Sequence, residues 1–463
     1  MADVRMTASP RPVHVRAAVA LLAALVLVAA CGDGIDEGAG SATTEAAPEA
    51  TTAPTDSVAA PQLPTFEVDA LDPDITRSIA EYAGSHSIVT LSDGSYLLAG
   101  FDNQSDPEHP ERGAVWHSDD LEAWKRVGRE ISDAKNQQTI SELLSIGDRA
   151  IAAGTDFSRD SGPQEFSKFD ATAWISDDRG SHFEATRLEK DARVLGARVL
   201  GDEVVVWGFH IVDDAAVARI WRSADHGDHW TTQSPAAPIG PGEATAPLVE
   251  IDDVLEWGGH LFAIGVNQYT DPDADGSFTL DVHTEQAADD PVDVGIWYSD
   301  DDGETWADAS PGGLAGLSGA QYVRGVVVAG DHLVILAAAA HFPAGNVVSF
   351  PENFTATMYS CDQALQQCSQ TPLHSGGYDF VFGPIVESDG MVIAVPRLSN
   401  GTGTSETGRL VLFDPTSDSF STTSLNGDLT QVECLLVDDS TLYLFGHSKR
   451  TNLLQVGKAP DPR

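Results

Sequence analysis

The sequence predicts an all-β fold built from repeated units of four short strands, and three observations support this prediction. A frame of an aromatic residue, Ser, Asp and Gly, with a second aromatic close behind, occurs four times. The serines of the four copies are 58, 47 and 76 residues apart, about one four-stranded unit with insertions. Short apolar segments alternate with turns that contain Asp, Gly or Asn, and no long stretch has helical periodicity.

Seven units follow one another from residue 66 onward. Each begins with two apolar strands joined by a tight turn, and a variable loop leads to a third and a fourth strand. The first four units contain the expected strands 87–91, 95–100, 114–118 and 123–127; 140–146, 150–154, 172–176 and 182–188; 194–200, 204–209, 218–223 and 230–234; and 249–257, 260–265, 294–299 and 305–309. Three later units lack the frame but keep the same alternation of apolar strands and turns. Their expected strands are 323–330, 332–340, 356–361 and 368–373; 380–388, 391–398, 409–415 and 420–425; and 431–437, 441–447 and 453–459.

The seventh unit has three expected strands instead of four. The segment "TFEVDAL" (65–71) near the N-terminus has no other partner, so we expect it to supply the missing strand. Pairing of the first and last segments removes the free edges that an open ring would leave. The sequence therefore predicts a β-propeller of seven blades, each of four antiparallel strands, with six blades as the alternative.

The repeated frame resembles the Asp-box, or BNR repeat, of sialidase-like β-propellers. The resemblance implies a hairpin turn between the two outer strands of a blade, away from the ligand-binding face. Ser and Asp side chains can bond backbone groups of such a turn, and Gly permits a positive φ. Repetition on one register favours a structural role, because an active site needs its acid once. The box residues are Ser118, Asp120 and Trp124; Ser176, Asp178, Gly180 and Phe183; Ser223, Asp225, Gly227 and Trp230; and Ser299, Asp301, Gly303 and Trp306.

The first copy departs from the frame. It reads "SDDLEAW", lacks the glycine and is one residue shorter, so we expect an altered turn.

The N-terminus predicts export and lipid anchoring. Three arginines precede an apolar run, 17–30, which is too short to cross a bilayer comfortably and reads as a secretory signal. The run ends "LVAAC", which resembles the lipobox of bacterial lipoproteins. This resemblance implies cleavage before Cys31, lipid attachment to its sulfur and a position on the extracytoplasmic face of the cell membrane.

Small, polar and proline residues dominate the stretch that follows Cys31, so we expect a disordered tether there. The predicted organisation is a signal peptide at 1–30, a tether at 31–64 and a propeller at 65–463.

Cys361 and Cys368 stand where the fifth unit would carry its box. They lie at the two ends of a short hairpin loop in an exported protein, which predicts a disulfide, with two free thiols as the alternative. Cys434, in an apolar strand, is expected to be a buried thiol.

The composition is strongly acidic, with 71 acidic and 26 basic residues and a formal net charge of −45. This charge argues against nucleic acid and anionic membrane surfaces as partners. It otherwise indicates solubility or adaptation to salt.

The stretch "DPDADGSFTLD" (271–281) is a candidate calcium loop, because it begins as D-x-D-x-D-G. Val282 occupies the place of the closing bidentate acid, and the nearest acid stands one position earlier. Calcium is thus the one cofactor that the sequence suggests, with a solvated acidic loop as the alternative. The candidate ligands are Asp271, Asp273, Asp275 and Asp281.

Sialidase activity is the enzyme hypothesis that the resemblance implies, through an arginine triad, a Tyr–Glu nucleophile and an Asp acid. Ser87 or His86 stands where the first arginine belongs. Arg324 and Arg397 lie near strand starts or loops of later units, and Tyr378 is a poor match to the nucleophile. No P-loop, GxSxG, HExxH or CxxC motif occurs. No catalytic residue is therefore assigned, and a protein without enzyme activity is favoured.

The favoured function is a binding or scaffold module at the cell surface, with an envelope protein or a glycan as its ligand. A sialidase-like glycoside hydrolase and an assembly factor for a membrane complex are the alternatives. Three long segments, 267–292, 341–355 and 398–408, join second and third strands. We expect them to emerge on one face, opposite the boxes, where loops are free to vary.

Overall fold

The computed structural model describes only part of the segment that is expected to form the propeller. The described residues are 82–102, 112–129, 131, 137–157, 169–212, 215–234, 248–268, 292–309, 320–341, 353–362, 365, 368–372, 379–399, 409–424, 429–438, 441–448 and 451–460. The expected signal peptide, lipidation site, tether and strand 65–71 all lie outside them. Among the described residues, no helix has the length and apolar character needed to cross a membrane.

The described strands form seven antiparallel sheets, six of four strands and one of three. Sheets 1 to 4 comprise β1 (Tyr82–Thr90), β2 (Tyr96–Asp102), β3 (Arg112–Ser118) and β4 (Lys125–Val127); β5 (Gln137–Ile146), β6 (Arg149–Phe157), β7 (Phe169–Ser176) and β8 (Glu184–Lys190); β9 (Ala192–Leu200), β10 (Glu203–Val212), β11 (Ala215–Ser223) and β12 (Thr231–Gln233); and β13 (Leu248–Trp257), β14 (His260–Gln268), β15 (Val292–Ser299) and β16 (Ala307–Asp308). Sheets 5 to 7 comprise β17 (Ala320–Ala329), β18 (His332–His341), β19 (Asn353–Cys361) and β20 (Cys368–Pro372); β21 (Asp379–Ser388), β22 (Met391–Ser399), β23 (Arg409–Asp414) and β24 (Ser419–Ser424); and β25 (Leu429–Asp438), β26 (Thr441–Ser448) and β27 (Thr451–Pro460). The prediction of an all-β fold of antiparallel sheets is confirmed for these residues.

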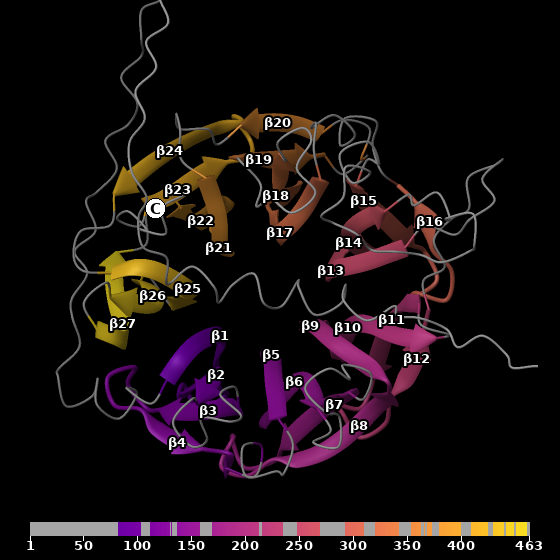
Figure 1. Cartoon of the computed structure of the whole chain (residues 1–463), viewed down its shortest axis with the longest axis vertical. Coiled ribbons are helices and arrows are strands. Elements are labelled where there is room, and N and C mark those ends of the chain that lie inside the picture. Colours follow the sequence, from indigo (N-terminus) through magenta and orange to yellow (C-terminus); the bar gives the residue numbers. More distant parts are fainter. Residues whose placement is uncertain are drawn as a thin grey trace, which may run out of the picture.

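The seven sheets stand around a common axis, each with its first strand innermost (Figure 1). The inner strands contact one another in chain order, from β1 through β5, β9, β13, β17 and β21 to β25. β25 also contacts β1, so the last sheet lies beside the first.

The apolar core is divided among the junctions between sheets. Consecutive valines of β10 show why: Val204 and Val206 pack toward sheet 2, whereas Val205 packs toward sheet 4, and all three are fully buried. Because successive side chains point to opposite faces of a strand, a sheet covered on both faces has a continuous apolar run. Each of the seven junctions has its own cluster of buried side chains.

The junction between sheets 7 and 1 joins the two ends of the described chain. Phe445 on β26 is fully buried and meets the edge of Trp124 from sheet 1, with ring centroids 6.2 Å apart. The Tyr96 hydroxyl donates a hydrogen bond of 2.5 Å to Asp438 on β25. Contacts between residues more than three hundred positions apart thus hold these two sheets together.

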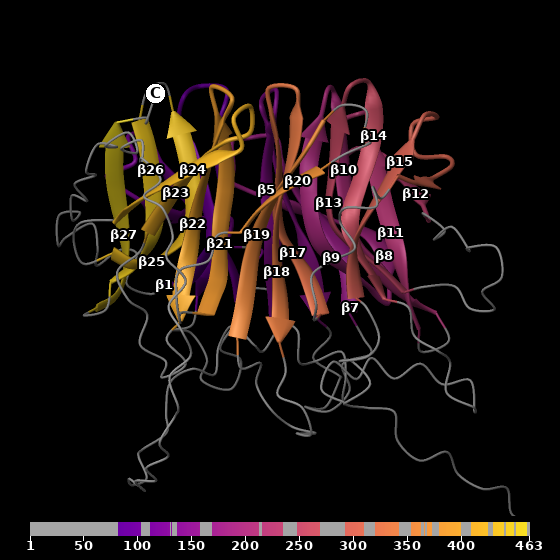
Figure 2. The same cartoon turned by 90° about the horizontal axis from the view of Figure 1, so that it is seen from above.

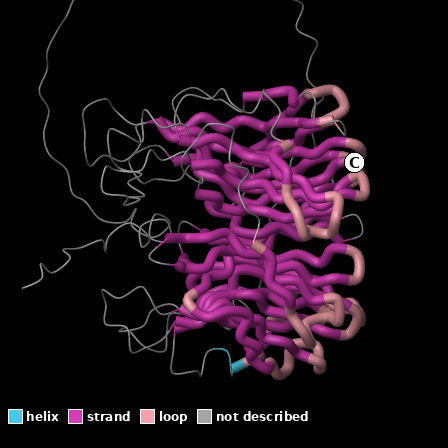
Figure 3. Tube along the Cα trace, turned by 90° about the vertical axis from the view of Figure 1, so that its right-hand side faces the viewer, coloured by secondary structure: helices cyan, strands magenta, loops and turns pink. Residues whose placement is uncertain are grey.

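The two faces of the ring differ in how the strands are connected. Short turns between first and second strands, and between third and fourth strands, gather at one face, called the turn face (Figures 2 and 3). Second strands end and third strands begin at the opposite face, called the loop face. The connections 269–291, 342–352 and 400–408 therefore leave from and return to the loop face, as the sequence predicts.

We expect Phe445→Ala to lower the free energy of unfolding by about 3–5 kcal/mol, because it opens a cavity at the junction of sheets 7 and 1. Phe420→Ala on β24 is the control, since Phe420 is 41% exposed, and it should change stability by less than about 0.5 kcal/mol. Urea unfolding followed by tryptophan fluorescence measures both. Equal effects of the two substitutions would contradict the packing described.

Candidate functional site

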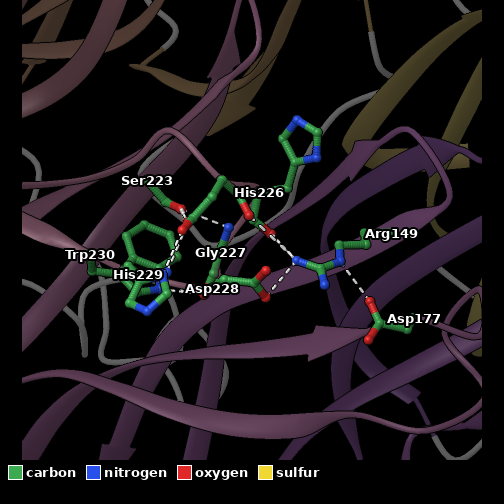
Figure 4. Close-up of polar contacts among 9 residues, drawn as sticks. Arg149, Asp177, Ser223, His226, Gly227, Asp228, His229 and Trp230 are labelled. Carbon is green, nitrogen blue, oxygen red and sulfur yellow. Dashed lines mark hydrogen bonds and ion pairs between the residues drawn. The ribbon is translucent and has the colours of Figure 1, made fainter.

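The third box shows how the repeated frame builds its turn (Figure 4). The buried Ser223 hydroxyl donates to Asp225 Oδ1 over 2.9 Å and accepts from the Gly227 amide over 2.7 Å. Asp225 in turn accepts from the backbone amide of His229 at 2.8 Å and contacts the His229 ring at 2.6 Å. The indole of Trp230 donates to the Gly227 carbonyl at 2.9 Å. Serine and aspartate thus satisfy amides that a tight turn would leave unpaired.

The second and fourth boxes repeat this geometry. Ser176 accepts from the Gly180 amide at 2.7 Å and Ser299 accepts from the Gly303 amide at 2.8 Å. Asp178 accepts from the amide of His182, and Asp301 from the amide of Thr305, both at 2.8 Å. In the fourth box the Trp306 indole donates to the Gly303 carbonyl, whereas Phe183, its counterpart in the second, is buried between sheets 1 and 2.

The first box has the altered turn that its sequence predicts. Asp120 Oδ1 accepts from the amides of Glu122 and Ala123, both at 2.9 Å, and Asp120 also bonds Ser118. Leu121, with φ 61°, is the one residue of this turn in the left-handed region. The later boxes have two such residues in succession, for example His226 and Gly227.

Glycine is required in the full-length boxes for a second reason. A Cβ on Gly227 would lie 2.9 Å from the Ile175 side chain of sheet 2, and one on Gly303 would lie 2.5 Å from Gln233 of sheet 3. The turn therefore rests directly on the preceding sheet.

Hydrogen bonds from the backbone and ring of His229 lower the pKa of Asp225 to about 2. The same contact raises the pKa of His229. A side-chain hydrogen bond from Thr305 lowers the pKa of Asp301. These carboxylates are acceptors held in the charged form, which suits turn formation rather than proton donation.

Arginines connect the boxes to neighbouring sheets. Arg149 on β6 pairs with Asp228 in the third box at 2.8 Å and donates to the His226 carbonyl at 3.2 Å (Figure 4). It also contacts Asp177 of its own sheet at 2.6 Å. Because one guanidinium presents several donors, it can bridge two turns at once.

Two more arginines join a box to a neighbouring sheet. Arg222 of sheet 3 donates to the Asp302 carbonyl in the fourth box, and Arg179 in the second box pairs with Asp93 of sheet 1. The boxes thus tie sheet to sheet across the turn face.

In sheet 5, a disulfide occupies the place of the box. It joins Cys361 and Cys368, which are paired across β19 and β20. Cys434 on β25 is buried in the junction of sheets 7 and 1.

A β-bulge interrupts every inner strand at an equivalent position. The extra residues are His86, Ser141, Leu195, Asp252, Arg324, the pair Gly383 and Pro384, and Glu433. Bulges bend a strand and change the direction of its side chains, and they are common next to functional sites.

Glycines on the second strands make room for these bulges. A Cβ on Gly154 would lie 1.9 Å from the Thr139 carbonyl, and one on Gly208 would lie 1.9 Å from the Arg193 carbonyl. Only a residue without a side chain fits where the bulged backbone comes so close.

At or near the residues that follow the bulges, polar side chains form a network across the junctions of sheets 1 to 5. Ser87 on β1 donates to Glu142 on β5 and accepts from the Leu143 amide at 3.0 Å. Arg198 on β9 pairs with Asp253 on β13 at 2.8 Å, and its guanidinium lies 3.5 Å from the Val326 carbonyl on β17. This inner-strand network comprises Ser87, Glu142, Arg198 and Asp253.

The two carboxylates of the network are unusual acids. Burial raises the pKa of Glu142 to about 7, against hydrogen bonding to Ser87 and the positive charge of Arg198. Burial also raises the pKa of Asp253 to about 6. Asp253 Oδ1 is buried and has no hydrogen-bond partner among the described residues. Perturbed acids of this kind mark candidate functional sites.

The other candidates from the sequence are placed only in part. Arg324 lies in the bulge of β17, and Arg397 lies on β22 opposite Val381. Tyr378 and the candidate calcium loop, 271–281, lie outside the described residues. In the part of the chain that the structure describes, no three His, Cys, Asp or Glu side chains are grouped so that they could hold a metal ion.

Sequence reasoning missed the inner-strand network. Its signal was present: Ser87 and Glu142 are 55 residues apart, as are Arg198 and Asp253, which is about one repeat. Polar residues at that period inside otherwise apolar first strands indicate contact between neighbouring units.

Comparisons with known proteins find similar structures but no similar sequences. No protein-family model matches this sequence, and no curated protein sequence matches it. Trypanosoma rangeli sialidase is similar in structure at 14% identity and a TM-score of 0.42, over 72% of this chain and 54% of that one. A Mycobacterium tuberculosis puromycin-hydrolyzing peptidase is similar at 12% identity and a TM-score of 0.48, over 87% of this chain and 55% of the peptidase. An α-L-arabinofuranosidase of Fusarium graminearum is similar at 12% identity and a TM-score of 0.39, over 85% of this chain and 97% of the arabinofuranosidase.

The chain thus spans about half the length of the sialidase and of the peptidase. At these identities and TM-scores the matches assign no activity to this chain.

We expect Ser223→Ala to lower the free energy of unfolding by about 1–3 kcal/mol, because it leaves the buried Gly227 amide without its acceptor. Ser181→Ala, at an exposed position in the second box, is the control and should cost less than about 0.5 kcal/mol. Urea unfolding measures both variants. A Ser223→Ala protein as stable as the control would show that the serine does not hold the turn.

Proposed function

We propose that this protein is a lipid-anchored, extracytoplasmic β-propeller of seven blades that binds an envelope protein or a glycan through its loop face. The observation that carries the proposal is the difference between the two faces. On the turn face, the boxes use their Ser and Asp side chains to close turns, and Asp228 of the third box pairs with Arg149 of the preceding sheet. The loop face is where the long connections 269–291, 342–352 and 400–408 begin and end.

A rigid frame with variable loops at one end is a common design for recognition. Loops tolerate changes of length and sequence without loss of the frame, so binding residues accumulate there. The packed junctions between sheets supply that frame, and the loop-face connections are the part that differs most among the seven units.

The seven described sheets support a count of seven blades, and the segment 65–71 is proposed as the fourth strand of the last. Sheet 7 has three described strands, and β27 is its outermost one. A strand added along β27 would complete the blade and cover an edge that otherwise favours aggregation. It would also connect the tether to the ring beside sheet 1.

A glycoside hydrolase is the second candidate, and the inner-strand network is the observation that favours it. Glycosidases use two carboxyl groups, of which one acts as a general acid with a raised pKa. Glu142, with a pKa of about 7, has that property. Asp253 is buried against Arg198, however, and each described contact of the network joins protein to protein. Binding without turnover is therefore preferred.

Calcium binding by Asp271, Asp273, Asp275 and Asp281 is part of the proposal, because these acids belong to the longest loop-face connection. An ion there would order the connection and present a defined surface to a ligand.

We expect the loop face to carry the binding. Replacing residues 269–291 by Asn-Gly should reduce glycan or envelope-protein binding at least about tenfold, while the unfolding midpoint changes little, because the frame is retained. The control replaces Gly201 and Asp202, the turn between β9 and β10 on the turn face, by Asn-Gly and should leave binding unchanged. A glycan array and titration of purified envelope proteins provide the measurement.

The same preparations test hydrolysis with a panel of sialosides and β-glycosides. Turnover that disappears in the Glu142→Gln or Arg324→Ala variant would favour the hydrolase and reject the binding module. Equal binding by the 269–291 variant and its control would reject the loop face.

We expect Cys31→Ala to abolish lipid labelling, and either to release the protein in soluble form or to block its maturation, because the lipid would be attached to this sulfur. Labelling with a radioactive fatty acid and membrane fractionation measure the outcome. The matched control is Cys434→Ala, which should keep the label. Unchanged membrane partitioning of the Cys31→Ala protein with an uncleaved N-terminus would overturn the anchor.

A further inference from the structure

The residue that follows each inner-strand bulge changes in chemistry around the ring. In sheets 1, 2 and 4 it is Ser87, Glu142 and Asp253, and in sheet 3 it is Gly196. In sheets 5 and 6 it is Gly325 and Ile385, and a Cβ on Gly325 would lie 2.1 Å from the Ile385 side chain. One part of the ring is therefore joined by polar side chains and another by apolar packing.

The polar part has an excess of negative groups. Glu142 and Asp253 act on each other, and one guanidinium, that of Arg198, acts on both. The other groups that the described residues contribute to the network are uncharged: the Ser87 hydroxyl from β1, the Leu143 amide from β5, the Val254 amide from β13 and the Val326 carbonyl from β17. With both carboxylates ionised, the described network therefore carries one uncompensated negative charge.

The uncompensated charge lies where it is poorly hydrated. Asp253 is 7% exposed and its Oδ1 has no partner among the described residues, and Glu142 is half-buried. A second negative charge beside a single arginine is costly in such a place, and one carboxylate either takes up a proton or opens the structure to water.

We propose that Ser87, Glu142, Arg198 and Asp253 form a proton-controlled latch between the inner strands of sheets 1 to 5, closed while one carboxylate holds a proton and weakened when both are ionised. The inner strands β1, β5, β9, β13 and β17 contact one another in this order, so the latch acts on consecutive junctions. The inference does not depend on which ligand the loop face binds.

The direction of the pH dependence follows from the two acids. Their pKa values are raised to about 7 and about 6, so between about pH 4 and pH 7 the folded chain binds more protons than the unfolded chain. Their contribution to stability is fully present at a pH below the pKa values of the unfolded chain. It is lost as the pH rises through the raised pKa values of the folded chain. The box aspartates have lowered pKa values, so their contribution to stability is lost as the pH falls, in the opposite direction.

Hydrogen exchange of the whole protein, followed by mass spectrometry at about pH 5 and about pH 8 and corrected for intrinsic rates, tests the latch. Protection of β5, β9 and β13 should fall about tenfold or more from the lower to the higher pH, the effect of about one pKa unit. β21, whose corresponding residue is Ile385, should change much less.

Glu142→Gln mimics the protonated acid and should remove the pH dependence in β5 and reduce it in β9 and β13. The matched control Glu184→Gln, at an exposed position on β8, should keep it. Ser87→Ala offers a second variant if Glu142→Gln folds poorly. It removes a hydrogen bond that favours ionised Glu142, so the pKa of Glu142 should rise further. The loss of protection should then occur at a higher pH than in the wild-type protein.

Three results would overturn the proposal. One is an identical pH dependence in the wild-type and Glu142→Gln proteins. Another is an equal loss of protection in β21, which would indicate a general effect of pH. The third is suppression of the pH dependence by calcium or sodium ions, which would replace the proton by a metal ion.

Discussion

Packing between neighbouring sheets is the constraint on which the rest of this structure depends. Each sheet buries both faces, so alternate residues of one strand belong to two different cores, as Val204 and Val205 show. A sheet at the end of an open row would expose one such face, and the contact of β25 with β1 removes that exposure. The tight turns, the glycines and the bulges described above all serve to bring these faces together.

The boxes add a polar layer to this packing at the turn face. Their carboxylates accept backbone hydrogen bonds within the turn, and the turn then rests on the preceding sheet through its glycine and through arginines such as Arg149. Surface ion pairs contribute little individually, but here they hold turns whose backbone is already fixed by hydrogen bonds. The repeated acidic motif thereby has a structural role at the turn face.

The inner strands combine structural and titratable features. Bulges place backbone and side chains of neighbouring sheets close together, and glycines such as Gly154 and Gly208 are needed for that approach. Where the side chain after the bulge is polar, partly buried carboxylates meet a single arginine. The same local geometry therefore gives an inert apolar junction in one part of the ring and a proton-sensitive one in another.

The sequence by itself determined the strands, their grouping into repeated units and the hairpin turns of the boxes, because these depend on local patterns within one unit. Ser223, Asp225 and Gly227, for example, form their hydrogen bonds within five positions. The loop-face segments followed from the order of strands. The sequence could not place Glu142 beside Arg198, or Arg149 beside the third box, since those contacts join separate units. Only the ring brings such residues together, because their distance depends on how neighbouring sheets pack and on where each bulge bends its strand.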